Sequence, residues 1–190
     1  MRRKRVRITP GLKEALAWLT LSKAELAERL QLELVNNPCL AEEWCLPFPP
    51  SVPIEIDLIV ERTSRGLRVR LNDEGLPKPR HCSLGHDGLG PEAARHLQHR
   101  ARWVLTILRR RGEILEKVGQ AVAEAQQAYL EGQVARPIPL TLTAVAKRAG
   151  LHPSTVSRVT RRKFLLASRG LVEMRHLFPT PLIEAREAIR

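Results

Sequence analysis

The sequence predicts a mainly α-helical protein with a small β-hairpin and a helix-turn-helix. Three observations predict this fold class. Residues 10–36 and 91–130 repeat apolar side chains at helical spacing, whereas residues 54–71 alternate apolar and polar side chains as half-buried strands do. Residues 142–163 carry the small, glycine and apolar positions of a helix-turn-helix. The length of 190 residues allows one or two small domains.

The amino-terminal pattern predicts two short helices. Ser22 and Glu25 form a capping box, which places a helix start at Ser22. We therefore expect helices over residues 10–19 and 23–36. The second helix should end before Pro38, because the residue preceding a proline is disfavoured in a helix. The leucine stripe of these helices indicates that they pack on something, which could be a partner.

The next part of the chain predicts a linker, two strands and a loop. Residues 46–53 contain four prolines and should be a semi-extended linker. Strands are expected over residues 54–60 and 67–71, joined by a turn at residues 64–66. An isolated hairpin is marginally stable in water, so this hairpin must lean on the helices or on a partner. Residues 72–90 are rich in turn-forming residues and are expected to be a loop.

A long helical pattern runs from Pro91 to about Leu130. Gly112 lies inside the pattern and could bend or split the helix. A basic run, residues 109–111, coincides with that glycine. A solvated helix face and a contact with a partner explain this run equally well.

The helix-turn-helix pattern follows. Ala146 is small where two helices would cross, Gly150 can end the first helix, and Pro153 suits the first position of the second. Residues 165–178 should form a short wing-like or extended segment. Residues 95–190 contain 18 basic and 7 acidic side chains, which favours a polyanion partner over a helix pair that packs only on protein. The outer face of the second helix would carry His152, Ser154, Ser157, Arg158, Arg161 and Arg162.

The cysteine pattern predicts neither a disulfide framework nor a metal site. Cys39, Cys45 and Cys82 form no CxxC pair. His81 and His86 lie close to Cys82 in sequence, but no fourth zinc ligand has a compatible spacing. We therefore expect no metal and no cofactor, and a reducing cytoplasmic location.

Several function classes are excluded by the pattern. Lys13 and Glu14 interrupt the apolar core that an export signal would need after the basic start. No stretch of 18 apolar residues is present, so no membrane span is expected. No nucleophile–base pairing and no P-loop are visible, so we predict no enzyme activity and assign no catalytic residue.

Four segments, in this order, resemble the bacterial RNA polymerase sigma-54 (RpoN, sigma-N) factors. They are LTLSKAELAERLQLELVNNPCL, RVRLNDEGLPKPR, ARWVLTILRRRGEILEKVGQAV and LTAVAKRAGLHPSTVSRVTRRKFLLASRGLVEMRHLF. The resemblance departs from the family in two places. Only residues 44–52 stand where the family has a larger helical core-binding region, and no carboxy-terminal RpoN-box domain is recognisable before residue 190. The resemblance therefore implies a shortened version of the family.

The resemblance implies three partners: core RNA polymerase, promoter DNA and an AAA+ ATPase that acts as activator. It also implies which residues meet the DNA. Ser154, Thr155, Ser157 and Arg158 would meet the downstream promoter element, and His152 would have a DNA or capping role. Arg161, Arg162 and Lys163 would contact phosphates, which position a protein without specifying sequence.

The resemblance further assigns the surface that faces polymerase and activator. Arg102 and Trp103 would anchor the polymerase-facing helix, although a tryptophan is more often part of a core. The activator-facing helices would present Leu16, Leu19, Leu26, Leu30 and Leu34.

Five parts are expected along the chain. They are activator-responsive helices (1–45), a proline-rich linker (46–53), a residual core-binding region (54–135), the helix-turn-helix (136–180) and a tail (181–190). Two other functions stay open: a non-initiating protein that competes for RNA polymerase or activator, and a stand-alone helix-turn-helix regulator.

Overall fold

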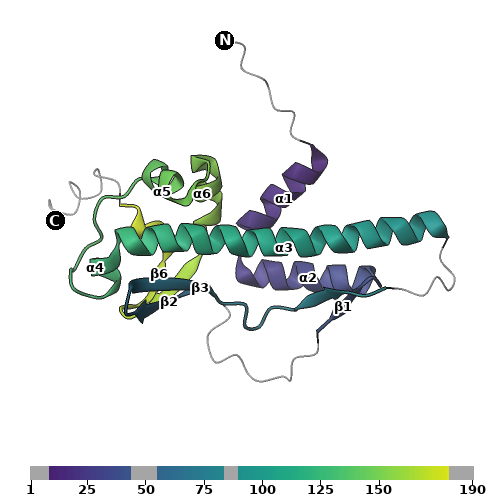
Figure 1. The fold of residues 1–190 in the computed structure, drawn as a ribbon, viewed down its shortest axis with the longest axis horizontal. Helices are drawn as coiled ribbons and strands as arrows, with labels where there is room; N and C mark the ends of the chain where they lie inside the picture. The colour runs from purple at the N-terminus through teal and green to yellow at the C-terminus, as the bar shows by residue number, and fades with distance from the viewer. Residues whose placement is uncertain (1–8, 44–54, 84–89, 180–190) are drawn as a thin grey trace, which may run out of the picture.

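One long helix forms the axis of the computed structural model, which describes residues 9–43, 55–83 and 90–179 (Figure 1). This helix, α3, has 35 residues and is therefore about 50 Å long. The remaining helices and strands pack along it, and the structure is mainly α-helical. The helices are α1 (Pro10–Thr20), α2 (Lys23–Asn36), α3 (Pro91–Ala125), α4 (Gln127–Leu130), α5 (Leu142–Ala149) and α6 (Pro153–Val159).

The two predicted amino-terminal helices are confirmed. Thr9 caps α1 by accepting the Leu12 N–H, and both hydrogen bonds of the predicted capping box between Ser22 and Glu25 are present at the start of α2. The basic start of the chain (residues 1–8), the linker over residues 46–53, residues 84–89 of the expected loop and the tail over residues 181–190 lie outside the described residues.

The predicted hairpin is confirmed, and it belongs to a larger sheet. Strands β2 (Ile56–Thr63) and β3 (Gly66–Leu71) pair antiparallel, as expected. Strand β5 (Phe164–Ala167) then pairs parallel to β2, and β6 (Gly170–Glu173) pairs with β5, giving the order β3-β2-β5-β6. The segment expected to be wing-like is therefore a second hairpin, followed by the 3₁₀ turn η1 (Met174–Leu177).

The prediction that residues 72–90 form only a loop is wrong for part of that segment. Strand β4 (Pro79–His81) pairs antiparallel with β1 (Leu40–Glu42), which follows α2. Three residues on each side give too weak a pattern for strand recognition from sequence alone. This second small sheet joins the end of α2 to the segment that precedes α3.

Helix α3 runs without a break through Gly112, so of the two possibilities at that residue, a bend or a split, the split does not occur. The helix ends at Ala125 instead. The next residue, Gln126, is 1% exposed. Its amide donates to the carbonyls of Ile138 and Leu177 and accepts the Ile138 N–H, which satisfies a buried polar group.

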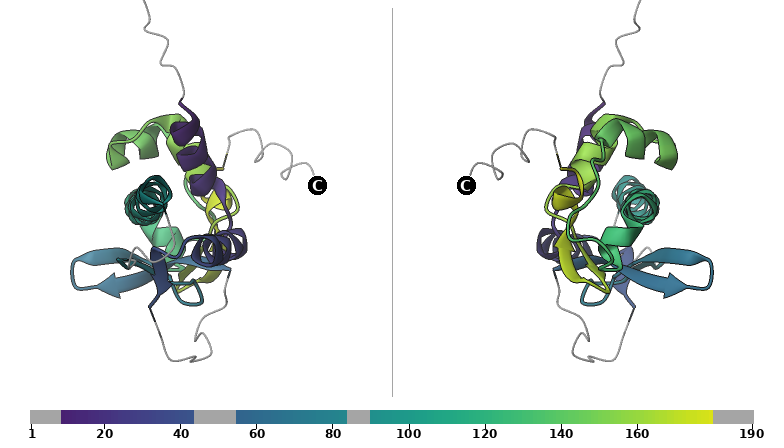
Figure 2. Two further views of the ribbon diagram at one scale, coloured as in Figure 1. Left: turned by 90° about the vertical axis from the view of Figure 1, so that its right-hand side faces the viewer. Right: turned by 90° about the vertical axis from the view of Figure 1, so that its left-hand side faces the viewer.

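Helices α5 and α6 lie on one side of α3, and strands β2 and β3 lie on the opposite side (Figure 2). One apolar cluster joins α3 to the sheet and to α5 and α6, with Leu58, Leu115 and Val156 among its buried members. A second cluster joins α1 and α2 to the first half of α3 around Trp18 and Leu30. Within the described residues, no helix has both the length and the apolar character needed to cross a bilayer.

Candidate nucleic-acid interface

Helices α5 and α6 meet at a tight turn whose hydrogen bonds are satisfied locally. Thr141 caps α5 by accepting the Ala144 N–H at 3.1 Å. Gly150 has a left-handed conformation (φ 66°, ψ 35°), and the N–H groups of Gly150 and Leu151 both donate to the carbonyl of Ala146. Because a left-handed C-cap strongly favours glycine, the sequence fixes the turn that orients α6.

One face of α6 is buried and the opposite face is polar. Val156 and Val159 are fully buried against the apolar cluster. The other face carries His152 and Ser154, which are exposed, and Thr155, Ser157 and Arg158, which are partly exposed.

Three of the exposed side chains form a hydrogen-bond network. The His152 imidazole caps α6, because its Nδ1 accepts the Ser154 N–H at 3.2 Å and lies 2.8 Å from the Ser154 Oγ. The Arg158 guanidinium donates to the same Oγ at 3.4 Å. The network holds the arginine along the helix and leaves most of its donors free for a partner.

Three cations follow α6, and two of them bind within the chain. The third, Arg161, is exposed and makes no ion pair with the residues that the structure describes. Arg162 is also exposed, but it has a φ of 52° and donates to both carboxylate oxygens of Glu25 on α2, at 2.9 and 3.1 Å. In this arrangement Arg162 holds α2 against the end of α6 and is occupied by a carboxylate.

Lys163 is not on the surface, so its expected phosphate contact is corrected here. Its side chain is 0% exposed, and its ammonium donates to the Leu21 carbonyl and lies 3.9 Å from the Asp57 carboxylate. A phosphate could reach this group only if the surrounding helices moved apart.

Lys163 belongs to a buried charge cluster that we define as Asp57, Arg111, Lys163 and Lys23. The carboxylate of Asp57 lies 3.7 Å from the Arg111 guanidinium and accepts the Phe164 N–H at 3.2 Å. Lys23 donates to the Ile56 carbonyl at 3.1 Å. The cluster joins the start of α2, strand β2, the middle of α3 and the start of β5.

Burial shifts the pKa values in this cluster in the direction that disfavours charge. Loss of solvent lowers the pKa of Lys163 to about 8, although Asp57 acts against the shift. Burial likewise lowers the pKa of Arg111 and that of Lys23. The pKa of Asp57 is raised by burial, and the neighbouring Lys163 and Arg111 oppose that rise.

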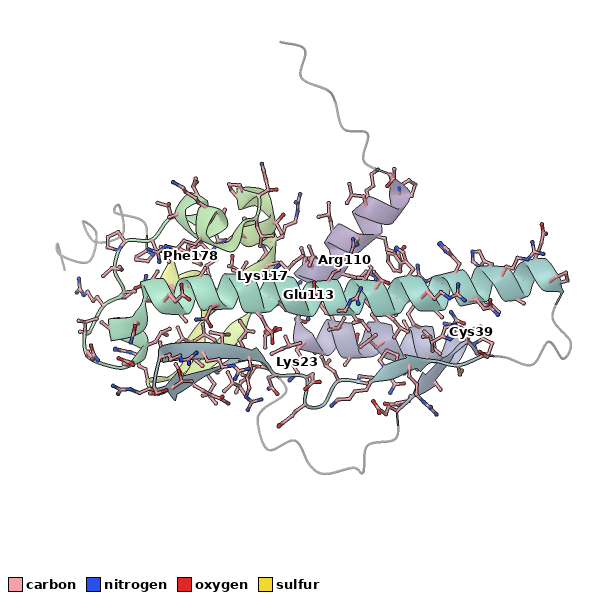
Figure 3. All side chains as sticks on the ribbon, in the orientation of Figure 1. Lys23, Cys39, Arg110, Glu113, Lys117 and Phe178 are labelled. Atoms are coloured by element: carbon pink, nitrogen blue, oxygen red, sulfur yellow. The ribbon has the colours of Figure 1, made fainter. Side chains whose placement is uncertain are left out.

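The basic run at residues 109–111 has two different environments. Arg109 and Arg110 are exposed, and Arg109 lies 3.9 Å from Glu113. Arg111 is 3% exposed and donates to the Trp18 and Leu21 carbonyls, so the expectation of a solvated face or a partner contact is wrong for this residue. Figure 3 shows Arg110, Glu113 and Lys117 in a row along the exposed face of α3.

Comparison with protein families assigns the part of the chain that contains α3, α5 and α6 to a known family. Residues 92–188 match the family described as "Sigma-54, DNA binding domain". The chain belongs to the sigma-54 family. Residues 3–42 also match "Sigma-54 factor, Activator interacting domain (AID)", and they contain α1 and α2.

Individual sigma-54 proteins extend this comparison. The RNA polymerase sigma-54 factor of Pseudomonas aeruginosa is 32% identical over 195 residues, which cover 90% of this chain and 39% of that protein. The factor of Acidithiobacillus ferridurans is 33% identical over 127 residues, covering 64% and 27%. The chain therefore spans well under half the length of these relatives.

A solved sigma-54 structure shares the fold. The crystal structure of Aquifex aeolicus sigmaN bound to promoter DNA superposes with a TM-score of 0.51 and 18% sequence identity, over 96% of this chain and 54% of that chain. At this level of identity the likeness concerns the fold alone.

The leucine stripe of α1 and α2 faces the interior of this chain. Leu19, Leu26 and Leu30 are buried, and Leu16 and Leu34 are half-buried against the same clusters. The expectation that these five side chains face polymerase or activator is therefore corrected: the stripe packs on α3 and its neighbours. The large apolar side chains that α1 and α2 expose are Leu12, Leu32 and Val35.

The two residues expected to anchor the polymerase-facing helix differ in exposure. Trp103 packs edge-on against Trp18, with ring centroids 6.0 Å apart, and the Arg100 guanidinium lies 4.7 Å from its ring. Arg100 also pairs with Glu14 of α1 and Glu33 of α2. Trp103 thus serves the core that holds α1 and α2, whereas Arg102 is exposed.

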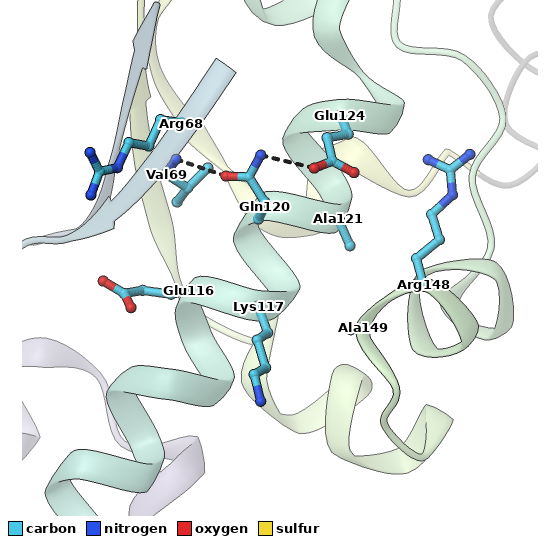
Figure 4. A pocket seen from close by; sticks show the side chains of 9 residues that line it. All are labelled: Arg68, Val69, Glu116, Lys117, Gln120, Ala121, Glu124, Arg148 and Ala149. Atoms are coloured by element: carbon cyan, nitrogen blue, oxygen red, sulfur yellow. Dashed lines mark hydrogen bonds between the residues drawn. The ribbon is translucent and has the colours of Figure 1, made fainter. Parts of the chain in front are cut away.

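A pocket of about 520 Å³ lies between β3, α3 and α5 (Figure 4). One of its lining residues, Gln120, joins α3 to β3: its amide accepts the Val69 N–H at 2.9 Å and donates to the Leu67 carbonyl at 2.9 Å. Glu116 accepts the Leu71 N–H, so two α3 side chains satisfy the outer edge of β3. The pocket contains none of the residues predicted to bind DNA.

Sequence reasoning missed two further cations near α6. Lys147 and Arg148 are exposed in the last turn of α5. The sequence places both cations directly before the turn that leads to α6, which could have indicated them. Cations are also favoured at the carboxy end of a helix because they stabilise its dipole, so this position alone does not indicate a DNA contact.

Proposed function

We propose that this chain is a sigma-54-type transcription initiation factor that binds core RNA polymerase and promoter DNA and depends on an ATP-driven AAA+ activator. The observation that carries the proposal is that matches to the activator-interacting and DNA-binding domains of sigma-54 occur in one chain, in that order. The five-part division into residues 1–45, 46–53, 54–135, 136–180 and 181–190 is retained within this proposal.

In this proposal α5 and α6 act as the helix-turn-helix. Helix α6 enters the major groove, where Arg158 reads base edges and Ser154 and Ser157 contribute hydrogen bonds. Thr155 and His152 lie at the amino end of the helix and contact the flanking backbone. Arg161 contacts a phosphate, together with the cations at the end of α5.

The amino-terminal helices would act through their outer surface. Leu12, Leu32 and Val35 are exposed on α1 and α2 and would contact the activator or polymerase. The exposed Arg102 of α3 would contact polymerase. The chain itself performs no catalysis in this proposal: the energy for promoter opening comes from ATP hydrolysis by the activator, in the cytoplasm.

A second candidate is a protein that occupies polymerase or activator without reading a promoter. The observation that favours it is the state of two predicted DNA contacts, since Arg162 pairs with Glu25 and Lys163 is buried. This arrangement reduces the cationic surface beside α6. A stand-alone helix-turn-helix regulator is disfavoured by the match to the activator-interacting domain.

Two measurements on the full chain separate these functions. Co-purification with core RNA polymerase should retain the chain under the proposed function and under the second candidate, whereas a stand-alone regulator should not bind. Footprinting of the complex on a sigma-54-type promoter should then show protection of the downstream element. Retention on polymerase without protection would support the second candidate and reject the first.

A further inference from the structure

The small β1–β4 sheet places two cysteines opposite each other. Its register pairs Leu40 with His81, and Cys39 and Cys82 are the next residues beyond that end of the ladder. The Cys82 N–H donates to the Cys39 carbonyl at 2.9 Å, whereas the Cys39 N–H donates to the Asn37 Oδ1 at 3.0 Å, so one of the two bonds of a ladder pair is present. Directly opposed residues of an antiparallel ladder have Cα atoms about 4.5–5.5 Å apart and side chains on one face. Disulfides form across Cα separations of about 4.4–6.8 Å.

The two thiols differ in accessibility. Cys39 is 0% exposed and packs in the cluster around Trp18. Figure 3 labels it at the end of α2, ahead of β1. Cys82 is half-buried, and its Sγ donates to the Pro38 carbonyl at 3.2 Å, so the sulfur is directed toward the segment that contains Cys39. Burial raises the pKa of the Cys39 thiol, and the proximity of Cys82 raises it further.

We infer that Cys39 and Cys82 form a dithiol modification site, which a low-molecular-weight disulfide such as oxidised glutathione converts into an intramolecular disulfide. The accessible Cys82 thiolate attacks one sulfur of the glutathione disulfide, forms a mixed disulfide and releases one glutathione thiolate. The Cys39 thiol then loses its proton and displaces the second glutathione. Both cysteines are oxidised, and one glutathione disulfide is reduced to two thiols.

The disulfide would add a covalent link between two parts of the chain that the β1–β4 ladder already joins. Cys39 lies inside the segment that matches the activator-interacting domain, residues 3–42, whereas Cys82 lies outside it, ahead of α3. Closing this long loop restricts the unfolded chain and should raise the thermal midpoint. The chemistry of the site does not depend on the proposed function.

The test uses the full chain, reduced and then equilibrated in buffers of reduced and oxidised glutathione. Free thiols are alkylated, and the intact mass is measured together with the non-reduced peptides from trypsin and Glu-C, because trypsin alone leaves Cys39 and Cys45 in one peptide. We expect most of the oxidised protein to carry one alkyl group where the reduced protein carries three, and to yield a Cys39–Cys82 cross-linked peptide. Dithiothreitol should reverse the change, and the oxidised form should melt at a higher temperature than the reduced form.

Three variants give the comparison its controls. Cys45→Ser should keep the cross-link, whereas Cys82→Ser should abolish both the cross-link and the melting shift. Cys39→Ala keeps a small apolar group in the buried position and should stop at the mixed disulfide. The inference is overturned if wild-type protein accumulates only glutathionylated Cys82, or if its cross-links all involve Cys45.

Discussion

Asp57 shows at the scale of one residue how the charge cluster depends on its anion. Its carboxylate lies within salt-bridge distance of both Arg111 and Lys163, and all three side chains are almost completely buried. A buried ion pair contributes little net stability, but removing one partner leaves charge unpaired in the interior. An asparagine side chain has almost the same shape as aspartate but no charge. Replacing Asp57 by asparagine therefore tests the contribution of the negative charge alone.

We therefore predict that Asp57→Asn lowers the free energy of unfolding by roughly 3–5 kcal/mol. Urea denaturation followed by circular dichroism measures the change. Asp73→Asn is the matched control, because Asp73 pairs with Lys78 at the surface, 3.4 Å away, and should change the free energy of unfolding by less than about 1 kcal/mol. Equal effects of the two substitutions would contradict the role given to the cluster.

Arg158 carries the sequence preference in the proposed function. Its guanidinium is tethered at one donor by Ser154, and the side chain is partly exposed on α6. We predict that Arg158→Ala weakens binding to a matched promoter duplex by about 1–3 kcal/mol and reduces the preference over a scrambled duplex. Fluorescence anisotropy at fixed salt measures both quantities.

Two other arginines serve as comparisons for this substitution. Arg161→Ala should weaken binding to matched and scrambled duplexes alike, because a phosphate contact carries no sequence information. Arg65→Ala, at the exposed tip of the β2–β3 hairpin, should leave both unchanged. If Arg158→Ala behaves as Arg161→Ala does, Arg158 does not read bases.

At the scale of elements, the contact between α3 and the sheet depends on one glycine. A Cβ atom at Gly119 would lie 2.6 Å from Leu58 Cδ1 and 3.0 Å from Val69 Cγ1. Leu58 is fully buried in the strand that this helix covers, so it has little room to shift. The close approach of α3 to β2 and β3 therefore requires the absence of a side chain at this position.

We predict that Gly119→Ala destabilises the fold, since overpacking costs about 1–3 kcal/mol and outweighs the gain of about 1 kcal/mol in helix propensity. Gly112→Ala is the control within the same helix. Its Cβ would lie 3.2 Å from Leu71 Cδ2, on a half-buried side chain that can move. Thermal melting should show Gly112→Ala unchanged or higher and Gly119→Ala lower; the reverse order would contradict this packing.

The sequence predicts the elements that depend on hydrogen bonds between nearby residues. It does not predict the strand pairings that join distant parts of the chain. The capping box at Ser22 and the glycine turn at Gly150 located α2 and α5–α6 because their hydrogen bonds lie within a few residues. The parallel pairing of β5 with β2 brings together residues more than a hundred positions apart. No periodicity within either strand specifies such a partner.

The same limit applies to the candidate site. The motif spacing correctly placed His152 and Ser154 on the exposed face of α6. It could not reveal that Lys163 is buried, because the group that neutralises it, Asp57, belongs to another element. The leucine stripe likewise predicted a buried face without indicating that α3, in the same chain, covers it.

At the scale of the whole molecule, the charge cluster and the Arg162–Glu25 pair hold the amino-terminal helices against the end of α6. Lys163 and Arg111 both donate to the Leu21 carbonyl, between α1 and α2. The segment that matches the activator-interacting domain and the segment that matches the DNA-binding domain are therefore joined by hydrogen bonds from buried charged side chains. A change in the charge of this cluster should alter the stability of the entire fold.

The pH dependence of the free energy of unfolding above pH 7 tests whether the charge of Lys163 affects the stability of the fold. Lys163 has a pKa of about 8 in the folded protein and an ordinary value of 10.5 when unfolded. Below pH 8 the amine is protonated in both states, and the folded state bears the full cost of burying the charge. Between these two values the unfolded state binds more protons, so the contribution of Lys163 to the free energy of unfolding rises with pH.

We therefore predict that the difference in unfolding free energy between wild type and Lys163→Met shifts in favour of wild type as the pH rises from 7 to 10. The rise should be at most about 3 kcal/mol, since each pKa unit corresponds to about 1.4 kcal/mol. Taking the difference removes the titration of groups common to both proteins, including Cys39. Parallel curves for the two proteins over this range would mean that the Lys163 amine titrates in the folded state as it does in the unfolded chain, which would contradict its burial in the charge cluster.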